Sequence, residues 1–243
     1  MHQVKRAIIM AAGTGSRMQP VTLYTPKPLV KVNGVRMIDT VIQGLHVNGI
    51  YEIYVVVGYL KEQFKCLEEE YDGLKLIENP YYDTCNNISS LYVARECLED
   101  VMILDGDQII YNTDILSPEF ELSGYNAIWT DKHTEEWLMK VKDGVVETCS
   151  RTGGSQGWQL YSISRWSAED GKRLKKHLEL EFEQKRNRQI YWDDVAMFCY
   201  FDEYRLGVRE MESTDIIEVD DYDELVKLDP IYRDFEGGNK NGK

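Results

Sequence analysis

A short glycine-rich segment near the N-terminus contains the residue types that bind a polyphosphate. It reads AAGTGSRMQP over residues 11–20 and follows the apolar run AIIM of residues 7–10, which has the composition of a buried strand. A small loop after a strand lets backbone N–H groups approach a phosphate closely, because no side chains stand between them. Arg17 adds a forked guanidinium and Lys27 a point charge. Together these residues predict a phosphate-binding loop.

The spacing of the glycines excludes two common phosphate-binding motifs. A P-loop requires a lysine directly after its second glycine, and no lysine follows Gly15. A Rossmann dinucleotide fingerprint requires a further glycine three residues after Gly15, where Met18 stands. The pattern that remains is G-x-G-x-R-x-x-P-x-T-x-x-x-P-K, which runs from Gly13 to Lys27. An ordinary turn with a surface arginine would not require so many matches in so short a stretch.

This pattern resembles the signature of the nucleotidyltransferases that activate sugar phosphates and related phosphorylated small molecules. Val21 stands where that family usually has leucine. The resemblance implies that Arg17 and Lys27 are catalytic. The loop residues then expected to bind the nucleotide are Ala11, Ala12, Gly13, Thr14, Gly15 and Ser16.

Two acidic segments predict a metal site. Asp105 and Asp107 directly follow the apolar run VMIL of residues 101–104, which places their carboxylates at the carboxyl edge of a sheet. Glu218 and Asp220 alternate with apolar residues, so on a strand both acids point to the same face. Carboxylates that share a face repel one another unless a hard cation such as Mg²⁺ lies between them. A polar turn and a half-exposed strand before a solvated helix are the alternatives.

The family resemblance assigns roles to these acids. It implies that Asp107, Glu218 and Asp220 hold Mg²⁺, while Asp105 contributes to nucleotide binding.

Further segments are similar to one branch, the bacterial LicC-type CTP:phosphocholine cytidylyltransferases, and the similarity covers nearly the whole chain. The segments are VGYLKEQF at 57–64, NNISSLY at 86–92, EW at 136–137 and YWD at 191–193. In the wider family the part matching 86–91 borders the nucleobase. Asn87, Ser89 and Ser90 are therefore expected to recognise the cytosine edge through amide and hydroxyl groups. An Asn-rich helix cap is a compatible alternative.

The same similarity points to an acceptor site built from rings and carboxylates. The quaternary ammonium of choline donates no hydrogen bonds, so it requires aromatic faces and negative charge. Trp137, Tyr191 and Trp192 supply rings, and Glu136 and Asp193 supply carboxylates. A primary ammonium, as in 2-aminoethylphosphonate, would depend on the carboxylates instead. The sequence offers both kinds of group, and buried tryptophans that belong to the core are a further alternative.

The expected reaction is the Mg²⁺-dependent conversion of CTP and phosphocholine to CDP-choline and pyrophosphate by in-line attack at the α-phosphorus. Arg17 would bind the β- and γ-phosphates, and Lys27 would neutralise the α-phosphate and the incoming phosphate. The alternatives are a CTP:2-aminoethylphosphonate cytidylyltransferase, a sugar-1-phosphate nucleotidyltransferase and a non-catalytic nucleotide-binding regulator. A regulator should have lost Arg17, Lys27 or Asp107, and all three are present.

Alternating strand and helix patterns predict an α/β fold with a Rossmann-like, mainly parallel mixed sheet flanked by helices. Residues 1–235 are expected to form one nucleotidyltransferase domain, in which a small insertion over about 125–200 covers the acceptor. Residues 236–243 are expected to be a flexible tail or a linker to a second domain. The expected strands are 7–10, 52–57, 74–78, 101–104, 126–130, 138–142 and 158–164, and the expected helices are 37–48, 60–71, 87–98 and 168–183.

Composition sets limits on partners and compartment. The net charge is −14, which argues against a nucleic-acid or anionic membrane surface. The apolar runs have strand length, and no signal peptide is expected before the first strand. The five cysteines are scattered and have no C-x-x-C pair, which favours reduced thiols in the cytoplasm and no zinc site. The sequence does not indicate an oligomeric state.

Overall fold

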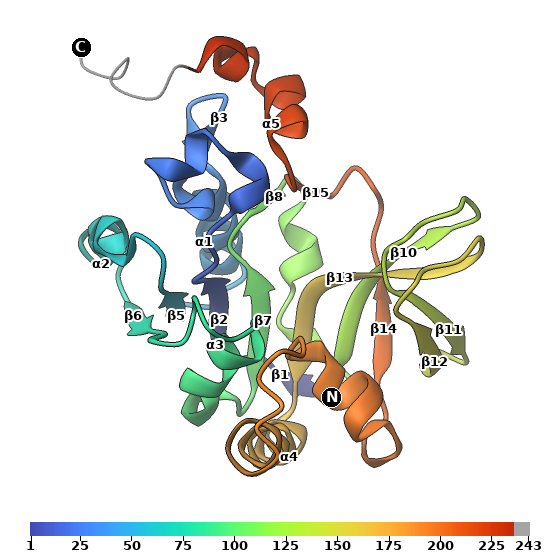
Figure 1. Ribbon diagram of the computed structural model, residues 1–243. Coiled ribbons are helices and arrows are strands. Elements are labelled where there is room, and N and C mark those ends of the chain that lie inside the picture. The colour runs from blue at the N-terminus through green and yellow to red at the C-terminus, as the bar shows by residue number, and fades with distance from the viewer. Residues whose placement is uncertain (236–243) are drawn as a thin grey trace.

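A nine-stranded mixed sheet runs through the molecule, with helices on both of its faces (Figure 1). The computed structural model describes residues 1–235, and the predicted tail at 236–243 lies outside them. Parallel strands in the order β7-β2-β5-β6 form one half of the sheet. Their bounds are β2 Arg6–Ala11, β5 Glu52–Val57, β6 Leu74–Glu78 and β7 Val101–Asp105. The predicted α/β fold and these strands are confirmed.

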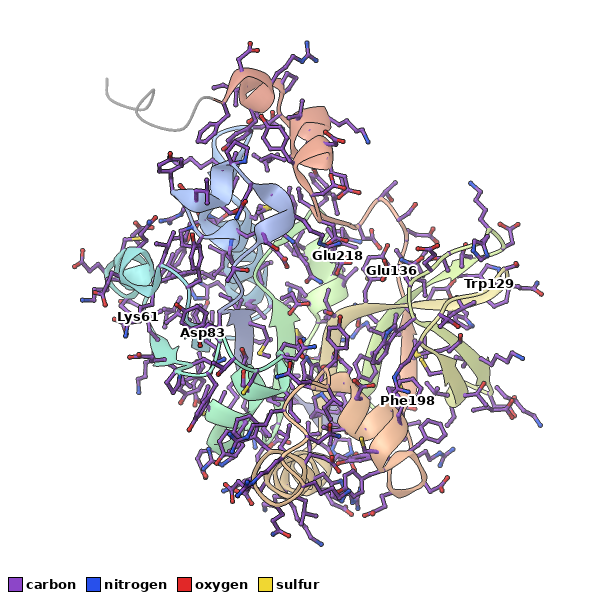
Figure 2. The ribbon with its side chains drawn as sticks, in the orientation of Figure 1. Lys61, Asp83, Trp129, Glu136, Phe198 and Glu218 are labelled. Atoms are coloured by element: carbon purple, nitrogen blue, oxygen red, sulfur yellow. The ribbon has the colours of Figure 1, made fainter. Side chains whose placement is uncertain are left out.

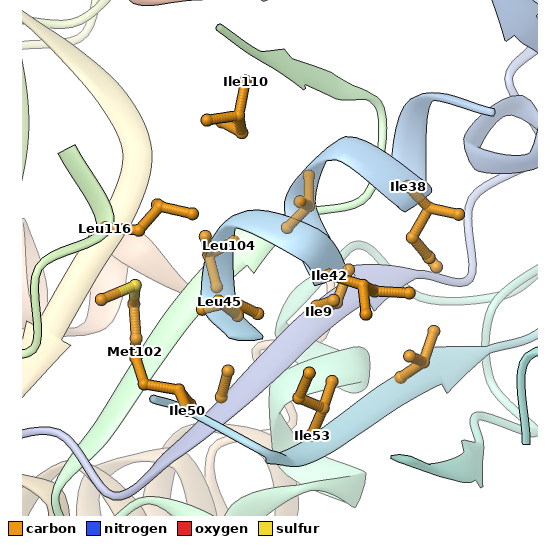
Figure 3. Packing of buried hydrophobic residues seen from close by; sticks show 14 of the residues in the cluster. Ile9, Ile38, Ile42, Leu45, Ile50, Ile53, Met102, Leu104, Ile110 and Leu116 are labelled. Carbon is orange, nitrogen blue, oxygen red and sulfur yellow. The ribbon is translucent and has the colours of Figure 1, made fainter. Parts of the chain in front are cut away.

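Both faces of the parallel strands are buried, which explains their nearly continuous apolar sequences. Along β2, Ala7 and Ile9 belong to the core cluster on one face, and Ile8 and Met10 belong to the cluster on the other. Figure 3 shows the first cluster, in which Ile42 and its neighbours on α1 pack against β2, β5 and β7.

Helices cover the two faces in separate sets. The helix α1 (Met37–Val47) and the helix α2 (Lys65–Glu70) contribute to the first cluster. The helix α3 (Ile88–Val93) and the helix α4 (Ala168–Glu179) contribute to the second. In three of the predicted helices only part of the range is α-helical. The rest is a 3-10 turn at Lys61–Phe64 or Arg95–Cys97, or a π-helix at Leu180–Gln184.

The expected insertion is a small closed ring of strands, shown to the right in Figure 1. Its pairings run β10-β14-β12-β11-β13 and close between β13 and β10. The bounds are β10 Gly124–Thr130, β11 Leu138–Lys142, β12 Val145–Ser150, β13 Gly157–Trp166 and β14 Gly207–Glu210. The strand β13 also pairs antiparallel with β7 and so joins the ring to the parallel strands.

The strands β12 and β14 were not predicted, because their side chains are mainly polar or half-exposed. The turn at Asp143 and Gly144, where both φ angles are positive, is a hairpin signal that would have indicated β12.

Short elements complete the chain. The strand β8 (Gln108–Ile110) pairs antiparallel with β15 (Ile216–Glu218), and the helix α5 (Tyr222–Leu228) follows. The remaining strands are β1 His2–Gln3 with β9 Glu119–Phe120, and β3 Lys31–Val32 with β4 Val35–Arg36. Further 3-10 or π turns span Ser16–Met18, Val21–Leu23, Lys27–Leu29, Thr113–Leu116, Val195–Cys199, Phe201–Glu203 and Pro230–Asp234. Within residues 1–235, no helix combines the length and apolar composition that crossing a bilayer requires.

Candidate active site

The glycine-rich loop leaves the carboxyl end of β2 and turns sharply at Gly15. Gly15 has a φ of 61°, in the left-handed region that favours glycine. A Cβ placed there would lie 3.0 Å from both the Lys27 Cβ and the Thr22 Cγ2. The Thr22 hydroxyl donates a 2.8 Å hydrogen bond to the Gly15 carbonyl and holds the turn. The motif threonine therefore shapes the loop, a role that the sequence analysis did not assign.

An open pocket of about 250 Å³ lies against this loop. It contains most of the residues predicted to bind phosphate. Its lining is Met10, Ala11, Gly13, Thr14, Gly15, Ser16, Arg17, Lys27, Pro28, Asp107 and Asp220. Ala12 is not among them, because it packs in the core while its carbonyl accepts a hydrogen bond from the Tyr59 N–H. The prediction that Ala12 contacts the nucleotide is therefore wrong for its side chain.

The two predicted catalytic cations meet the predicted metal ligands in this pocket. Lys27 Nζ lies 2.5 Å from Asp107 Oδ2 and 3.6 Å from Asp220 Oδ1. Arg17 Nη2 lies 2.9 Å from the same Asp220 oxygen. Burial favours the neutral amine of Lys27, but the Asp107 carboxylate outweighs it, so the pKa of Lys27 lies above its ordinary value. Lys27 is therefore a charged, nearly buried ammonium.

The acidic residues beside the pocket repel one another. The Gly106 N–H donates to the Met10 carbonyl, which keeps the end of β7 beside the loop. Burial, together with the Asp107 carboxylate, raises the pKa of Asp105 to about 7. Burial and the neighbouring aspartates raise the pKa of Glu218 to about 8, although Gln108 Nε2 donates a 2.7 Å hydrogen bond to it. A further cation at the site would therefore favour the ionised forms of Asp105 and Glu218.

These carboxylates fit a hard cation in donor type. Asp220 lines the pocket and contacts Lys27 and Arg17. Glu218 lies close enough for the charges of Asp107 and Asp220 to act on it. Oxygen donors of this kind suit Mg²⁺. Among residues 1–235, however, no three such side chains converge closely enough to form a ready-made metal site. Asp107 and Asp220 instead contact Lys27.

The segment predicted to border the nucleobase is partly structural. Ser89 is only 1% exposed, and its hydroxyl accepts from Asn79 Nδ2 and donates to the Asn86 carbonyl. Ser90 is also buried and accepts from the same Asn79 amide. The side-chain oxygen Oδ1 of the half-buried Asn87 accepts a hydrogen bond from the backbone N–H of Trp192. Ser89 is therefore buried with its hydroxyl proton already donated within the fold, so its contact with the base stays a prediction that this structure does not support.

The predicted acceptor rings do not form one group. Trp137 meets Tyr191 edge to face, with ring centroids 6.0 Å apart, and Tyr191 is 50% exposed. Trp192 is 1% exposed and packs against Tyr125 and Trp166 in the core. The prediction that Trp192 forms a wall of the acceptor site is therefore wrong, since its ring is enclosed by other aromatic side chains.

Sequence reasoning missed a cation beside these rings. The guanidinium carbon of Arg151 lies 3.5 Å from the centroid of the Phe198 ring and 6.0 Å from that of Trp137. Arg151 also forms an ion pair with the buried Asp194 carboxylate, with Nε 2.7 Å from Oδ1. No local motif marks Arg151 or Phe198, because the two residues are far apart in the sequence and come together only in the folded protein.

Asp193 is buried beside the carboxyl end of β7. It is 7% exposed, and its Oδ1 receives no hydrogen bond within the described part of the chain. The buried Tyr125 hydroxyl is the neighbouring donor, and it also has no partner of standard hydrogen-bond geometry among the described residues. Burial and repulsion from Asp105 raise the pKa of Asp193 well above its ordinary value. A buried carboxyl of this kind is a favourable partner for a cation.

Glu136 faces the same region from the insertion. Figure 2 shows Glu136 and Glu218 at neighbouring positions between β15 and the insertion. Burial and then these two carboxylates raise the pKa of Tyr161, on β13, to about 12, which places all three groups together. This part of the pocket surroundings is therefore acidic, and it includes Tyr161, which the sequence analysis did not single out.

This combination of a phosphate loop, a buried lysine and paired carboxylates at the carboxyl edge of a mixed α/β sheet defines a nucleotidyltransferase. A family model for the MobA-like NTP transferase domain matches residues 7–162. The chain belongs to this family, and the resemblance found in the sequence is confirmed.

Individual relatives are similar over nearly the whole chain. A 2-aminoethylphosphonate cytidylyltransferase of Lancefieldella rimae is 40% identical over 228 residues, which cover 93% of this chain and 92% of that protein. A choline-phosphate cytidylyltransferase of Streptococcus pneumoniae is 32% identical over 94% of this chain and 98% of that protein. The solved structure of the CTP:phosphocholine cytidylyltransferase LicC of Streptococcus pneumoniae superposes with a TM-score of 0.87, at 32% identity, over 94% of this chain and 99% of that one.

Proposed function

We propose that the protein is a Mg²⁺-dependent cytidylyltransferase that transfers CMP from CTP to 2-aminoethylphosphonate or a closely similar primary amine. The observation that carries the choice of acceptor is the buried Asp193 carboxyl, whose Oδ1 accepts no hydrogen bond of standard geometry among residues 1–235, although the Tyr125 hydroxyl lies beside it. A primary ammonium can donate to this oxygen and favour the ionised carboxylate as it binds, whereas a quaternary ammonium has no N–H to donate. The identity of 40% to a protein named for this phosphonate supports the same choice.

In the proposed reaction an oxygen of the acceptor phosphonate attacks the α-phosphorus of CTP. The bond from the α-phosphorus to the bridging oxygen breaks, and pyrophosphate leaves with the electron pair. The phosphonate is already an anion, so the reaction requires alignment and neutralisation of charge more than it requires a general base.

The ion pairs of the pocket indicate how the cations would reach the phosphates. Lys27 and Arg17 contact carboxylates in this structure. A triphosphate offers more negative charge than one carboxylate, so the two cations would move to phosphate oxygens as CTP binds. Arg17 would then bind the β- and γ-phosphates and Lys27 the α-phosphate.

That exchange would leave oxygen ligands available for a metal ion. Asp107, Glu218 and Asp220 would hold Mg²⁺, and a bound Mg²⁺ neutralises charge on the triphosphate and the leaving pyrophosphate. Burial, and after it the neighbouring aspartates, raise the pKa of Glu218 to about 8, and a cation that compensates both effects would favour its ionised form, which supports this assignment.

Phosphocholine is the second candidate acceptor. The structural similarity to LicC and the exposed Tyr191 ring beside Trp137 favour it. The burial of Trp192 removes one expected ring. In addition, the Arg151 guanidinium already stacks on Phe198, the neighbour of Trp137, where a quaternary ammonium would otherwise be accommodated. Because of these two observations we prefer 2-aminoethylphosphonate to phosphocholine, which is the reverse of the order that the sequence suggested.

The first experiment measures pyrophosphate release from CTP and Mg²⁺ with 2-aminoethylphosphonate, phosphocholine and glucose 1-phosphate in parallel. We expect kcat/KM to be highest for the phosphonate. A preference for phosphocholine would overturn the acceptor assignment and retain the transfer of CMP, whereas release with glucose 1-phosphate alone would identify a sugar-phosphate enzyme. Release with none of them would favour the non-catalytic alternative.

The variant Asp193→Asn tests the acceptor contact directly. A bound ammonium would favour the ionised Asp193 carboxylate, whereas the asparagine of the variant would stay neutral, so this variant should raise KM for 2-aminoethylphosphonate by about tenfold. Glu135→Gln, at an exposed acid of the insertion, is the matched control and should leave KM unchanged. An equal KM for Asp193→Asn and the wild type would remove Asp193 from the acceptor site.

A further inference from the structure

A second pocket, larger than the one beside the phosphate loop, lies at the opposite edge of the sheet. Its volume is about 370 Å³, and its lining includes Glu119, Gly124, Gly144, Arg165, Gly207 and Arg209. The strand β13 is antiparallel to both β7 and β10, so β10 runs parallel to β7, and β14 is parallel to β10. The pocket therefore lies at the amino ends of β10 and β14, whereas the phosphate loop follows the carboxyl end of β2.

Arg165 is a buried cation on the wall of this pocket. It is only 3% exposed. All of its hydrogen bonds go to neutral groups: Nε donates to the Ser117 carbonyl at 2.9 Å, Nη1 to Asn126 Oδ1 at 2.7 Å and Nη2 to the Ile115 carbonyl at 2.6 Å. A buried charge normally has a partner of opposite sign, because removal from water is costly.

Arg209 brings a second positive charge to the same place. Its Nη1 donates at 3.3 Å to the Ser117 carbonyl, the oxygen that also accepts from Arg165, and at 3.3 Å to the Glu119 carbonyl. Burial, and then the charge of Arg209, lower the pKa of Arg165 to about 9. The two guanidinium groups converge on one carbonyl oxygen although they repel each other.

No acid of residues 1–235 compensates this pair within ion-pair distance. Two carboxylates, those of Glu119 and Asp114, act on Arg209 through their charge but form no ion pair with it. Glu119 instead accepts a 2.8 Å hydrogen bond from the Ser117 hydroxyl. Neutral hydrogen-bond donors would be sufficient to hold the carbonyls of residues 115–119. That structural task therefore does not explain two positive charges. Two charges without a partner, beside an open pocket, are better explained by an anionic ligand.

We propose that this pocket is a second binding site, remote from the reaction centre, for a small molecule that carries a phosphate or phosphonate group. Arginine suits such a group because its planar fork donates two parallel hydrogen bonds to neighbouring oxyanion atoms. The volume exceeds that of the pocket beside the phosphate loop, so an organic substituent on the oxyanion can be accommodated. Arg209 contacts the ligand at the opening, and Arg165 supplies charge from beneath.

The test must separate this site from the active site, which also binds phosphate. The double variant Arg17→Ala/Lys27→Ala removes both cations beside the phosphate loop. In this background we titrate inorganic phosphate, and separately 2-aminoethylphosphonate, by isothermal titration calorimetry at constant ionic strength. One binding event should still be detected. Adding Arg209→Gln should weaken the affinity of this binding about tenfold or more, and Arg209→Lys should weaken it less.

The control is Arg205→Gln, which removes an equal charge at an exposed position outside the pocket and should leave the affinity unchanged. Circular dichroism verifies that each variant is folded. Tighter binding of the phosphonate than of phosphate would show that the organic part is also recognised. Absence of binding by both compounds in the double variant, or equal affinity with and without Arg209→Gln, would overturn the proposal.

Discussion

Lys27 and Asp107 form an ion pair of 2.5 Å between Nζ and Oδ2, at the point where the phosphate loop meets the carboxyl end of β7. The same ammonium lies 3.6 Å from Asp220, from the distant C-terminal part of the chain. A buried lysine between two carboxylates remains charged, and its pKa is raised above its ordinary value. This ion pair joins the predicted catalytic cation to the predicted metal ligands, so substitutions on either side should affect the same reaction.

The variant Lys27→Ala should lower kcat by about a hundredfold to a thousandfold, because it removes a cation aimed at charge that develops in the transition state. KM for CTP should change much less, since Arg17 and the loop backbone remain. Steady-state pyrophosphate release measures both constants. Lys61→Ala is the control, because Lys61 is paired with Glu78 at the surface, away from the pocket (Figure 2). An unchanged kcat in Lys27→Ala would show that the ammonium is not catalytic.

The variant Asp220→Asn should raise the Mg²⁺ concentration required for half-maximal rate by about tenfold or more, because a charged oxygen ligand is lost. A chelator should abolish turnover in the wild type. The titration of rate against Mg²⁺ checks the prediction, with Asp223→Asn on the exposed face of α5 as control. Identical Mg²⁺ titrations for wild type and Asp220→Asn would contradict a role of Asp220 in metal binding.

Stability should depend on pH through Asp193. Its pKa in the folded protein is raised well above the ordinary value of 3.8. The folded state therefore holds a proton that the unfolded chain has lost, and the free energy of unfolding falls as pH rises above about 4. Urea denaturation at pH 5 and pH 8 should show a fall that is larger in the wild type than in Asp193→Asn by about 1 kcal/mol or more. Parallel pH profiles of the two proteins would contradict the raised pKa.

Truncation of two neighbouring aromatic residues should destabilise the fold to very different extents. Trp192→Ala should lower the free energy of unfolding by about 3–5 kcal/mol, because it removes a ring packed against Tyr125 and Trp166. Tyr191→Ala should cost about 1 kcal/mol or less, since this ring is half exposed. Urea denaturation gives both values. A small loss for Trp192→Ala would return Trp192 to the list of candidate acceptor contacts.

The sequence by itself determined the features that depend on local patterns. Apolar runs of strand length and helical periodicity identified the parallel half of the sheet, because each pattern reflects burial within one element. The loop motif identified Gly15 and its neighbours, since a left-handed turn and close approach to phosphate restrict the residue types at those positions. The alternation of Glu218 and Asp220 with apolar residues likewise placed both acids at the site.

Only the tertiary structure decided which side chains meet across long separations. The contacts of Lys27 with Asp107 and Asp220 depend on β7 and β15 ending beside the loop, and no local pattern specifies these positions. Composition cannot distinguish a buried ring from an exposed one, and for this reason Trp192 and Tyr191 could not be separated in advance. The approach of Arg165 to Arg209 likewise depends on the tertiary structure, because their strands β13 and β14 lie on either side of β10. Burial and charge compensation are properties of the assembled sheet.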